Sequence, residues 1–228
     1  SRDAWTAFPG NWDAISKMCI IGYGQIRMAN LSVIASQSVN GVSKLHSDIL
    51  KESVFGDYND MYPERFTNVT NGIAHRKWLC YSNPGLSGLL DECIGTGYRK
   101  DPTQLDNFLK FREDTSVLAR LQQIKAENKK FFASEMKKKR GITVDPNSIF
   151  DVQVKRLHEY KRQLLNALSI VDIYFRLKDG SLTDFQPTVF LFGAKSAPGY
   201  ARAKAIIRYI NRIANLVNND PDVSDKLK

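Results

Sequence analysis

Two apolar runs, each followed by a helical pattern, constrain the fold more strongly than any other feature of this 228-residue sequence. They cover residues 149–154 and 188–192, and behind each run apolar side chains recur at steps of three and four, the period of an amphipathic helix. A strand-helix-strand-helix order predicts parallel strands joined by a right-handed crossover, in a sheet covered on both faces. The sequence therefore predicts an α/β fold over residues 148–219, as the start of a doubly wound parallel sheet.

The first strand-helix unit also predicts which side chains are buried. Ile149, Phe150, Val152 and Val154 are expected to form a buried strand that runs directly into a helix ending near Leu177. The apolar residues that set the period of this first helix are Leu157, Leu164, Leu168, Val171 and Phe175. Those of the second helix are Ala205, Ile206, Tyr209, Ile213 and Val217.

Potentially cationic side chains gather where this strand meets its helix, namely Lys155, Arg156, His158, Lys161 and Arg162. In an open α/β sheet the carboxyl ends of the strands face the ligand crevice, and the free N–H groups of a helix N-terminus attract anions. The cluster therefore predicts an anion site, for which phosphate is the natural ligand. The alternative is that these charges are solvated and cap the helix.

The chain before Gly141 is predicted to be mostly helical. An Asn40-Gly41 pair indicates a tight loop that needs positive backbone angles, and His46 fits a hydrogen-bonded structural residue better than a catalyst. Residues 66–69 resemble a short strand. Helices are expected over residues 12–37, 43–53, 84–94, 101–112 and 114–141, with Pro84 opening the third and Asp114 or Thr115 capping the last.

A second candidate ligand loop contains the pair Asn71-Gly72. The Asn71 amide can bind a ligand and Gly72 allows a close approach, although such pairs are also plain turns. The basic run at residues 75–77 lies beside Trp78, and cations next to an aromatic ring also suit a single-stranded nucleic acid. Both interpretations stay open from the residues alone.

The net charge of +9 favours an anionic partner. Much of the excess lies on the helix expected over residues 114–141, whose lysine-rich side is interpreted as a solvated face, with nucleic-acid contact as the alternative. Three widely spaced cysteines predict neither a disulfide framework nor a zinc site. No apolar run is long enough to span a bilayer, and no signal peptide is recognisable. Residues 193–199 match neither the P-loop nor the dinucleotide-binding pattern.

Several long motifs carry a resemblance to a known family. FDVQVKRLHEYKRQLLNAL, at residues 150–168, is almost letter for letter a signature of the glycogen and α-glucan phosphorylases. VNGVSKLHSDIL, NVTNGIAHRKWL with NPGLSGLL, and FGAKSAPGYARAKAIIRYI with NNDP resemble the same family, in the correct order. The similarity extends from about Pro9 to Lys228. Because complete phosphorylases are several times longer and the first residue is not Met, the chain is expected to be an interior segment.

The resemblance implies transfer of a glucosyl unit from an α-1,4-glucan to orthophosphate, giving glucose 1-phosphate, with pyridoxal 5′-phosphate as the cofactor. It implies a GT-B type, Rossmann-like fold in which residues 1–70 end the N-terminal domain. Residues 71–228 then begin the C-terminal domain, helical over 76–141. The enzyme is expected to be a cytoplasmic homodimer with no metal, nucleic-acid or membrane partner. The lysine that binds pyridoxal is expected after Lys228, so the isolated chain should be inactive.

The resemblance assigns the cations to two phosphate groups. Lys155 resembles the lysine near the cofactor phosphate, and Trp78 corresponds to an aromatic wall near the cofactor. Arg156 and Lys161 resemble the pair that grips the substrate phosphate, a role that suits the planar fork of arginine. His158 is part of the motif and is expected to have a supporting role.

The same resemblance assigns the sugar contacts. Tyr160 and Asn71 resemble residues that hydrogen-bond the glucosyl unit, Val42 corresponds to a backbone position that lines the glucose pocket, and Tyr200 resembles a tyrosine at its entrance. Departures from the family pattern concern loop residues and secondary contacts, at Gln37, Ala74, His75, Lys77 and Ala194. Two other classes stay open, a nucleic-acid-binding module built on the basic face of residues 125–140 and a non-catalytic binder of phosphorylated ligands built on residues 155–162.

Overall fold

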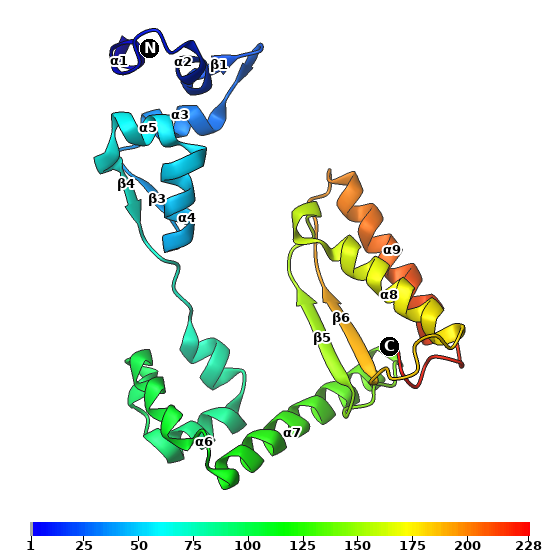
Figure 1. Cartoon of the computed structure of the whole chain (residues 1–228). Helices are drawn as coiled ribbons and strands as arrows, with labels where there is room; N and C mark the ends of the chain where they lie inside the picture. The colour runs from blue at the N-terminus through cyan, green and yellow to red at the C-terminus, as the bar shows by residue number, and fades with distance from the viewer. Residues whose placement is uncertain (1) are drawn as a thin grey trace. The chain divides into compact units, whose positions relative to one another are not determined.

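A computed structural model describes residues 2–228 of the chain, which divides into two compact units (Figure 1). The first unit is Ser1–Ser82 and the second is Asn83–Lys228. Each unit is described by itself. The domain boundary expected after residue 70 concerns the longer family members and stays a prediction.

The first unit is built from short elements around one small core. Its buried residues are Ala4, Met18, Val33, Tyr58 and Phe66. Its helices are α1 (Arg2–Ala7), α2 (Trp12–Met18), α3 (Met28–Ala35), α4 (Lys44–Ile49), α5 (Gly56–Met61) and three short 3-10 or π-helical segments, Leu50–Val54, Pro63–Arg65 and Arg76–Tyr81. Its strands are β1 (Ile21–Gly22), β2 (Gln25–Ile26), β3 (Val39–Gly41) and β4 (Phe66–Asn68).

The helix predicted over residues 12–37 is wrong in its middle. The antiparallel hairpin of β1 and β2 separates α2 from α3. Tyr23 and Gly24, at the hairpin tip, both have positive φ angles of 53° and 71°, which is the backbone of a tight two-residue hairpin turn. The apolar period continues across this turn, so periodicity alone could not reveal it.

The role predicted for Gly41 is also wrong. Gly41 has no positive φ; it is the last residue of β3, which pairs in parallel with β4 in the register Val39↔Phe66 to Gly41↔Asn68. A Cβ at this position would lie 2.1 Å from Ser47 Oγ and 2.6 Å from the Ser47 backbone nitrogen. Glycine is therefore required here because α4 packs directly against the strand.

Replacing Gly41 with alanine should destabilise the first unit by about 1–3 kcal/mol, because the new methyl group has no space. Trp5, Trp12 and Trp78 all lie in this unit, so denaturant unfolding followed by tryptophan fluorescence measures the effect. Gly72→Ala is the matched control, since a Cβ at Gly72 meets nothing within 4 Å and the residue has no positive φ. Equal stability of the two variants would contradict the packing argument.

The helical part of the second unit follows its predicted start and stop signals. It consists of α6 (Pro84–Ile94), 3-10 segments at Gly97–Arg99 and Pro102–Phe111, and α7 (Thr115–Arg140). Asp114 Oδ1 accepts hydrogen bonds from the N–H groups of Ser116 and Val117 at 2.9 and 3.2 Å, and Gly141 ends α7 with a φ of 70°. The caps predicted for α7 are confirmed, whereas the helix expected over 101–112 is 3-10.

The α/β part has the predicted order β5 (Ile149–Val154), α8 (Gln163–Lys178), β6 (Thr188–Gly193) and α9 (Ala201–Asn218). The strands are parallel, in the register Ile149↔Thr188 to Val154↔Gly193. Residues 226–228 continue the sheet beyond β6, because Leu227 pairs in parallel with Thr188. Both helices lie on one side of the two strands (Figure 1) and share a core with Phe190 and Phe192.

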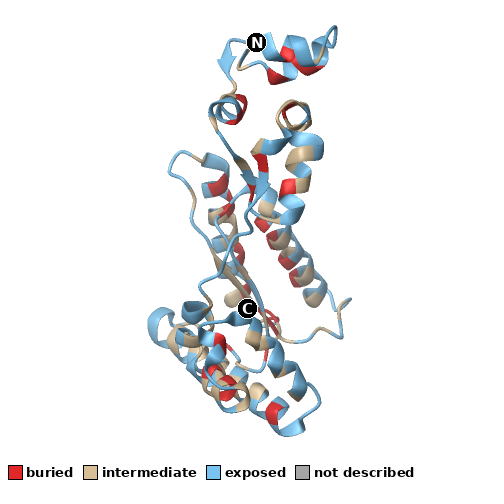
Figure 2. Ribbon diagram, turned by 90° about the vertical axis from the view of Figure 1, so that its left-hand side faces the viewer, coloured by how far each residue is buried: buried red, intermediate tan, exposed pale blue. Residues whose placement is uncertain are grey.

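The expectation of a strand buried on both faces is wrong for β5. Ile149, Val152 and Val154 are 55, 57 and 68% exposed. Figure 2 colours the chain by burial, with exposed residues in pale blue. Phe190 and Phe192 of β6 pack in the core of α8 and α9, and the Phe132 ring of α7 lies 5.7 Å from that of Phe150 in β5. Apolar composition therefore predicted the strand correctly and its burial incorrectly.

The start and the inward face of α8 also differ from prediction. The helix begins at Gln163, six residues after Leu157, because Arg162 has a φ of 61° and interrupts the helical backbone. Leu164, Leu168 and Phe175 are 42, 48 and 58% exposed. The residues that α8 buries are Gln163, Ala167, Ile170 and Tyr174.

Candidate functional site

Two loops meet at the carboxyl ends of β5 and β6, as expected for an open parallel sheet. One loop is residues 155–162, which includes a 3-10 turn at Glu159–Lys161, and the other is residues 194–200. The Lys155 N–H donates to Gly193 O and the Leu157 N–H donates to Lys195 O, both at 3.0 Å. The strand pairing thus continues into the loops and holds them side by side.

Between the loops lies a hollow of about 450 Å³. Its lining residues are Arg156, Leu157, His158, Tyr160, Lys161, Lys195, Ser196, Ala197 and Tyr200. In the described part of the chain, the side chains of Arg156, Lys161 and Lys195 form no ion pair. Three cations therefore surround one hollow with their charges uncompensated by protein carboxylates, which makes it a candidate anion site.

A buried leucine anchors this loop. Leu157 is 3% exposed and packs against Ala203 and Ile206 of α9. Its neighbours Arg156 and His158 both line the hollow. One apolar contact therefore fixes the middle of an otherwise charged segment to the adjacent helix.

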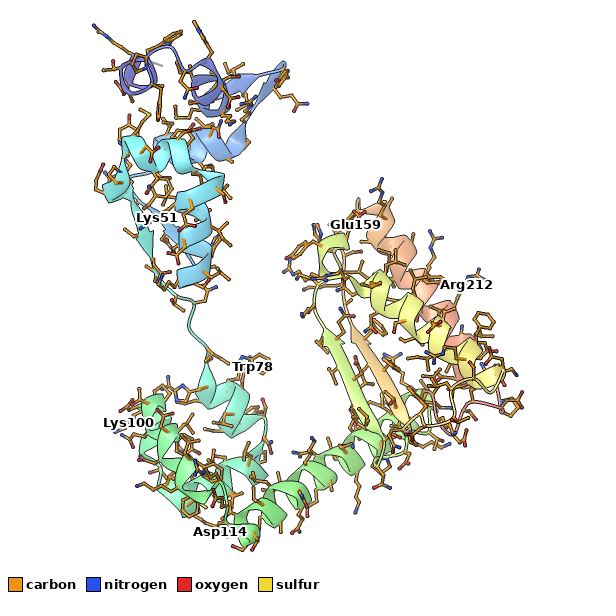
Figure 3. The ribbon with its side chains drawn as sticks, viewed as in Figure 1. Lys51, Trp78, Lys100, Asp114, Glu159 and Arg212 are labelled. Atoms are coloured by element: carbon orange, nitrogen blue, oxygen red, sulfur yellow. The ribbon has the colours of Figure 1, made fainter. Side chains whose placement is uncertain are left out.

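The one carboxylate in the loop is already engaged. Glu159, labelled in Figure 3, accepts a hydrogen bond from the Tyr200 hydroxyl and one of 3.0 Å from Arg202 Nη1. The hydrogen bond from Tyr200, followed by that from Arg202, lowers the pKa of Glu159, and the same bond raises the pKa of Tyr200. Glu159 is therefore ionised at neutral pH and pairs with Arg202. The hydrogen bond between Tyr200 and Glu159 links the two loops.

Replacing Tyr200 with phenylalanine should raise the pKa of Glu159 toward its ordinary value, because the largest cause of the lowering is removed. A carboxyl whose pKa is lowered by folding stabilises the fold above its unfolded pKa. That contribution is lost as the pH falls through the folded pKa. Carbon-detected NMR titration of the Glu159 carboxyl measures the change. Glu92, whose pKa is lowered by Arg120, is the internal control and should not shift; an unchanged Glu159 would contradict the assignment.

The structure brings four of the predicted site residues to the hollow, namely Arg156, Tyr160, Lys161 and Tyr200. The His158 ring lies between Tyr160 and Tyr200, with centroid distances of 4.6 and 5.4 Å. Lys155 lies at the end of β5, is exposed and does not line the hollow. The roles predicted for these residues stay predictions.

The other predicted site residues belong to the first unit. Val42 and Asn71 lie together just beyond the paired strands β3 and β4, and the Asn71 N–H donates to Val42 O at 2.9 Å. The Val42 N–H donates to His46 Nδ1 at 3.1 Å, which gives His46 the structural hydrogen bond expected of it. Trp78, labelled in Figure 3, is 62% exposed, and Lys77 Nζ lies 5.2 Å from the centre of its ring.

Sequence reasoning missed Lys195 and Ser196. The small-residue turn that contains them was set aside because it lacks a P-loop pattern. A usable signal was nevertheless present, since both residues lie within four residues of the end of a predicted strand, and ligand-facing residues of parallel sheets occupy such positions.

Several cations on the basic side of α7 have local partners. Lys129 Nζ donates to Ser148 O at 2.6 Å and lies 4.6 Å from the centre of the Phe150 ring. Lys139 pairs with Glu135 at 2.5 Å, and Lys137 donates to Thr143 Oγ1 at 3.0 Å. The contacts of Lys137 and Lys139 are those of a solvated helix face, whereas Lys129 is half-buried against Ser148 and Phe150. Within residues 2–228, no group of three or more His, Cys, Asp or Glu side chains is placed to hold a metal ion, and no helix is long and apolar enough to cross a membrane.

Comparison with known proteins identifies the family of this chain. The family model of the carbohydrate phosphorylases matches residues 1–228. The chain belongs to this family. The match covers the whole chain, including the two loops that carry phosphorylase motifs. It confirms the resemblance found in the sequence.

Among its phosphorylase relatives, the chain is 46% identical over 227 residues to the glycogen phosphorylase of Bacillus subtilis. It is 46% identical over 224 residues to the brain form of Bos taurus, and 45% identical over 224 residues to the glycogen phosphorylase of Chlamydia trachomatis. These matches cover 100, 97 and 97% of the chain. The chain spans 28, 27 and 27% of the length of these relatives.

Proposed function

We propose that the protein containing this chain is an α-glucan phosphorylase of glycogen, starch or maltodextrin breakdown. It transfers a glucosyl unit from the non-reducing end of an α-1,4-glucan to orthophosphate and releases glucose 1-phosphate. The observation that supports this most strongly is the hollow at the ends of β5 and β6, lined by Arg156, Lys161 and Lys195. The similarity of the chain to glycogen phosphorylases also supports this proposal.

The cations in the hollow suit the electrostatics of phosphorolysis. Arg156 presents a planar fork that can bind two phosphate oxygens, while Lys161 and Lys195 act as compact charges. Two like charges about 4 Å apart repel by roughly 4 kcal/mol at an effective dielectric constant of about 20. Fixed cations offset this repulsion when the orthophosphate approaches a second phosphate group. Positive charge at this position is therefore what the reaction requires.

Pyridoxal 5′-phosphate is the cofactor that we assign to the whole enzyme. The residues present fit its phosphate, because Lys155 is exposed at the end of β5 next to Arg156 and forms no ion pair in the described residues. When bound, the cofactor supplies a phosphate group that exchanges a proton with the substrate phosphate. Lys155 would hold that group, and Trp78 would contact the cofactor.

We assign the sugar contacts to residues of the family motifs. The Tyr160 hydroxyl and the Asn71 amide would hydrogen-bond the glucosyl unit, the backbone at Val42 would line its pocket, and Tyr200 would stand at the entrance. The parallel pair β5 and β6, with residues 226–228 alongside, is compatible with a GT-B type domain. A cytoplasmic homodimer with no nucleic-acid or membrane partner completes the proposal.

The isolated chain should bind orthophosphate and yet form no glucose 1-phosphate, since it spans little more than a quarter of its relatives. The first result is measured by isothermal titration, and the second by incubating the chain with pyridoxal phosphate, orthophosphate and glucan. Formation of glucose 1-phosphate would contradict the claim that the chain alone is catalytically incomplete. Absence of orthophosphate binding would contradict the claim that the hollow is a phosphate site. Salt-sensitive binding of labelled DNA or RNA that is lost on charge reversal of Lys137–Lys139 would favour a nucleic-acid module instead.

A further inference from the structure

The backbone carbonyls of two cationic residues in the hollow are each held by a glutamine side chain. Gln163 Nε2 donates to Arg156 O, and Gln153 Nε2 donates to Lys161 O, both at 3.1 Å. Arg156 and Lys161 are the two lining cations contributed by the loop of residues 155–162. The same kind of bond therefore acts on each of them.

The two bonds cross the loop in opposite directions. Gln153 belongs to β5, which precedes the loop, and it holds Lys161 near the end of the loop. Gln163 is the first residue of α8, which follows the loop, and it holds Arg156 near the beginning. Each end of the loop is thus tied to the element at its other end, so that the backbone of neither Arg156 nor Lys161 can move away without breaking one of these bonds.

The orientation of the Gln153 amide is itself fixed. Asn166 Nδ2 donates to Gln153 Oε1 at 3.0 Å, which leaves the Gln153 NH₂ group to face Lys161 O. The Asn166 backbone N–H donates to Arg162 O at 3.1 Å. Asn166, Gln153 and Lys161 therefore form a chain of hydrogen bonds that runs from the first turn of α8 through β5 to the loop.

Gln163 is the more costly of the two glutamines. It is 1% exposed, and among the described residues its Oε1 is buried without a hydrogen-bond partner. A buried amide with one unsatisfied oxygen costs free energy that an apolar side chain would avoid. Its NH₂ group donates to Arg156 O, seven residues earlier, and among the described residues its Oε1 accepts from no N–H group of the helix. Packing and helix capping therefore do not explain a glutamine here, whereas control of the loop does.

We propose that Gln153 and Gln163 are positioning residues that hold Arg156 and Lys161 in the geometry that binds phosphate. The proposal rests on the proposed function, because it takes the hollow to be the phosphate site. A bidentate site must be held to within a fraction of an ångström, and small displacements of such groups cost large factors in binding and rate. The two amides supply this constraint from the rigid strand and helix on either side.

The test compares Gln153→Met and Gln163→Met with Gln122→Met, which makes the same substitution at an exposed position of α7. Methionine keeps the length of the side chain and removes the donor. Orthophosphate affinity, measured by titration of the 228-residue chain, should fall roughly 5- to 30-fold in each loop variant and stay unchanged in the control. Wild-type affinity in both loop variants would overturn the proposal.

Amide hydrogen exchange separates positioning from general stability. The N–H groups of Leu157, Lys161 and Arg162 are hydrogen-bonded within the site, and their exchange should accelerate in the loop variants while that of the α8 interior stays at the wild-type rate. Equal acceleration throughout α8 would mean a purely structural role and would overturn the proposal. Gln163 is buried, so Gln163→Met could fail to fold. Two other variants then decide the test: Gln153→Met, at a partly exposed position, and Asn166→Ala, which removes only the bond that orients the Gln153 amide.

The two proposals fail in different ways. A wild-type chain that binds no orthophosphate would overturn the phosphate site, and the positioning role with it, whatever the exchange rates show. A wild-type chain that binds orthophosphate, together with loop variants that bind it equally well, would overturn only the positioning role.

Discussion

Replacing Arg156 with alanine is expected to weaken orthophosphate binding by roughly 10- to 100-fold, the value of one hydrogen-bonded charge contact. Arg156 lines the hollow, has no ion pair among the described residues and can bind two oxygens at once. Its removal therefore deletes contacts to the ligand without leaving a protein carboxylate unpaired. Isothermal titration of the chain with orthophosphate measures the loss.

Arg208→Ala is the matched control for this variant. Arg208 is an exposed residue of α9 that does not line the hollow, so the substitution changes the net charge equally. Its effect should be confined to long-range electrostatics, which disappears above physiological salt. If Arg156→Ala and Arg208→Ala weaken binding to the same extent, the hollow is not the phosphate site, and the roles proposed for it in phosphorolysis and in the binding of phosphorylated ligands lose their support.

Replacing Leu157 with alanine should destabilise the second unit by about 2–5 kcal/mol, the usual cost of a large cavity in a packed core. Leu157 is 3% exposed and joins the charged loop to Ala203 and Ile206 of α9. Releasing this contact should also loosen the loop and weaken orthophosphate binding. Denaturant unfolding followed by circular dichroism, which reports the long helices α7, α8 and α9, measures the change in stability.

Leu165→Ala provides the same substitution at a position that is 58% exposed, and its cost should stay below about 1 kcal/mol. Tryptophan fluorescence supplies an internal reference, because all three tryptophans lie in the first unit. The unfolding midpoint of the first unit, measured by this fluorescence, should be the same in both variants as in the wild type. Equal costs for the two leucines would show that Leu157 does not anchor the loop.

The loop of residues 155–162 could be predicted from the sequence only in part. The position of Arg156 and Lys161 after a strand was predictable, because an apolar run that ends in charged residues indicates a strand end. The left-handed backbone of Arg162 was not, since arginine is not among the residue types that favour a positive φ. It delays the start of α8 to Gln163 and turns Leu164 and Leu168 toward the surface.

Two further failures concern a polar residue and a glycine in the interior. Gln163 is buried because it reaches a loop carbonyl, so the inward face of α8 includes a residue that any hydrophobic pattern assigns to solvent. Gly41 is buried because Ser47 packs against its backbone, although an Asn-Gly pair normally indicates a turn. In both cases the decisive contact joins residues whose proximity the local pattern does not encode.

The sequence by itself determined the family, the strand-helix order after Gly141, the caps of α7 and the gathering of cations at a strand end. The caps and the cations are local, since they depend on residue types within one turn or one strand, and the family and the strand-helix order follow from motifs and patterns read along the chain. Only the tertiary structure decided which cations share a hollow, because Lys195 joins Arg156 and Lys161 through the parallel pairing of β5 with β6. It also placed the side-chain amides of Gln153 and Gln163 within hydrogen-bond distance of Lys161 O and Arg156 O. Hydrogen bonds that close a loop across two elements depend on the packed fold, so no local pattern could contain them.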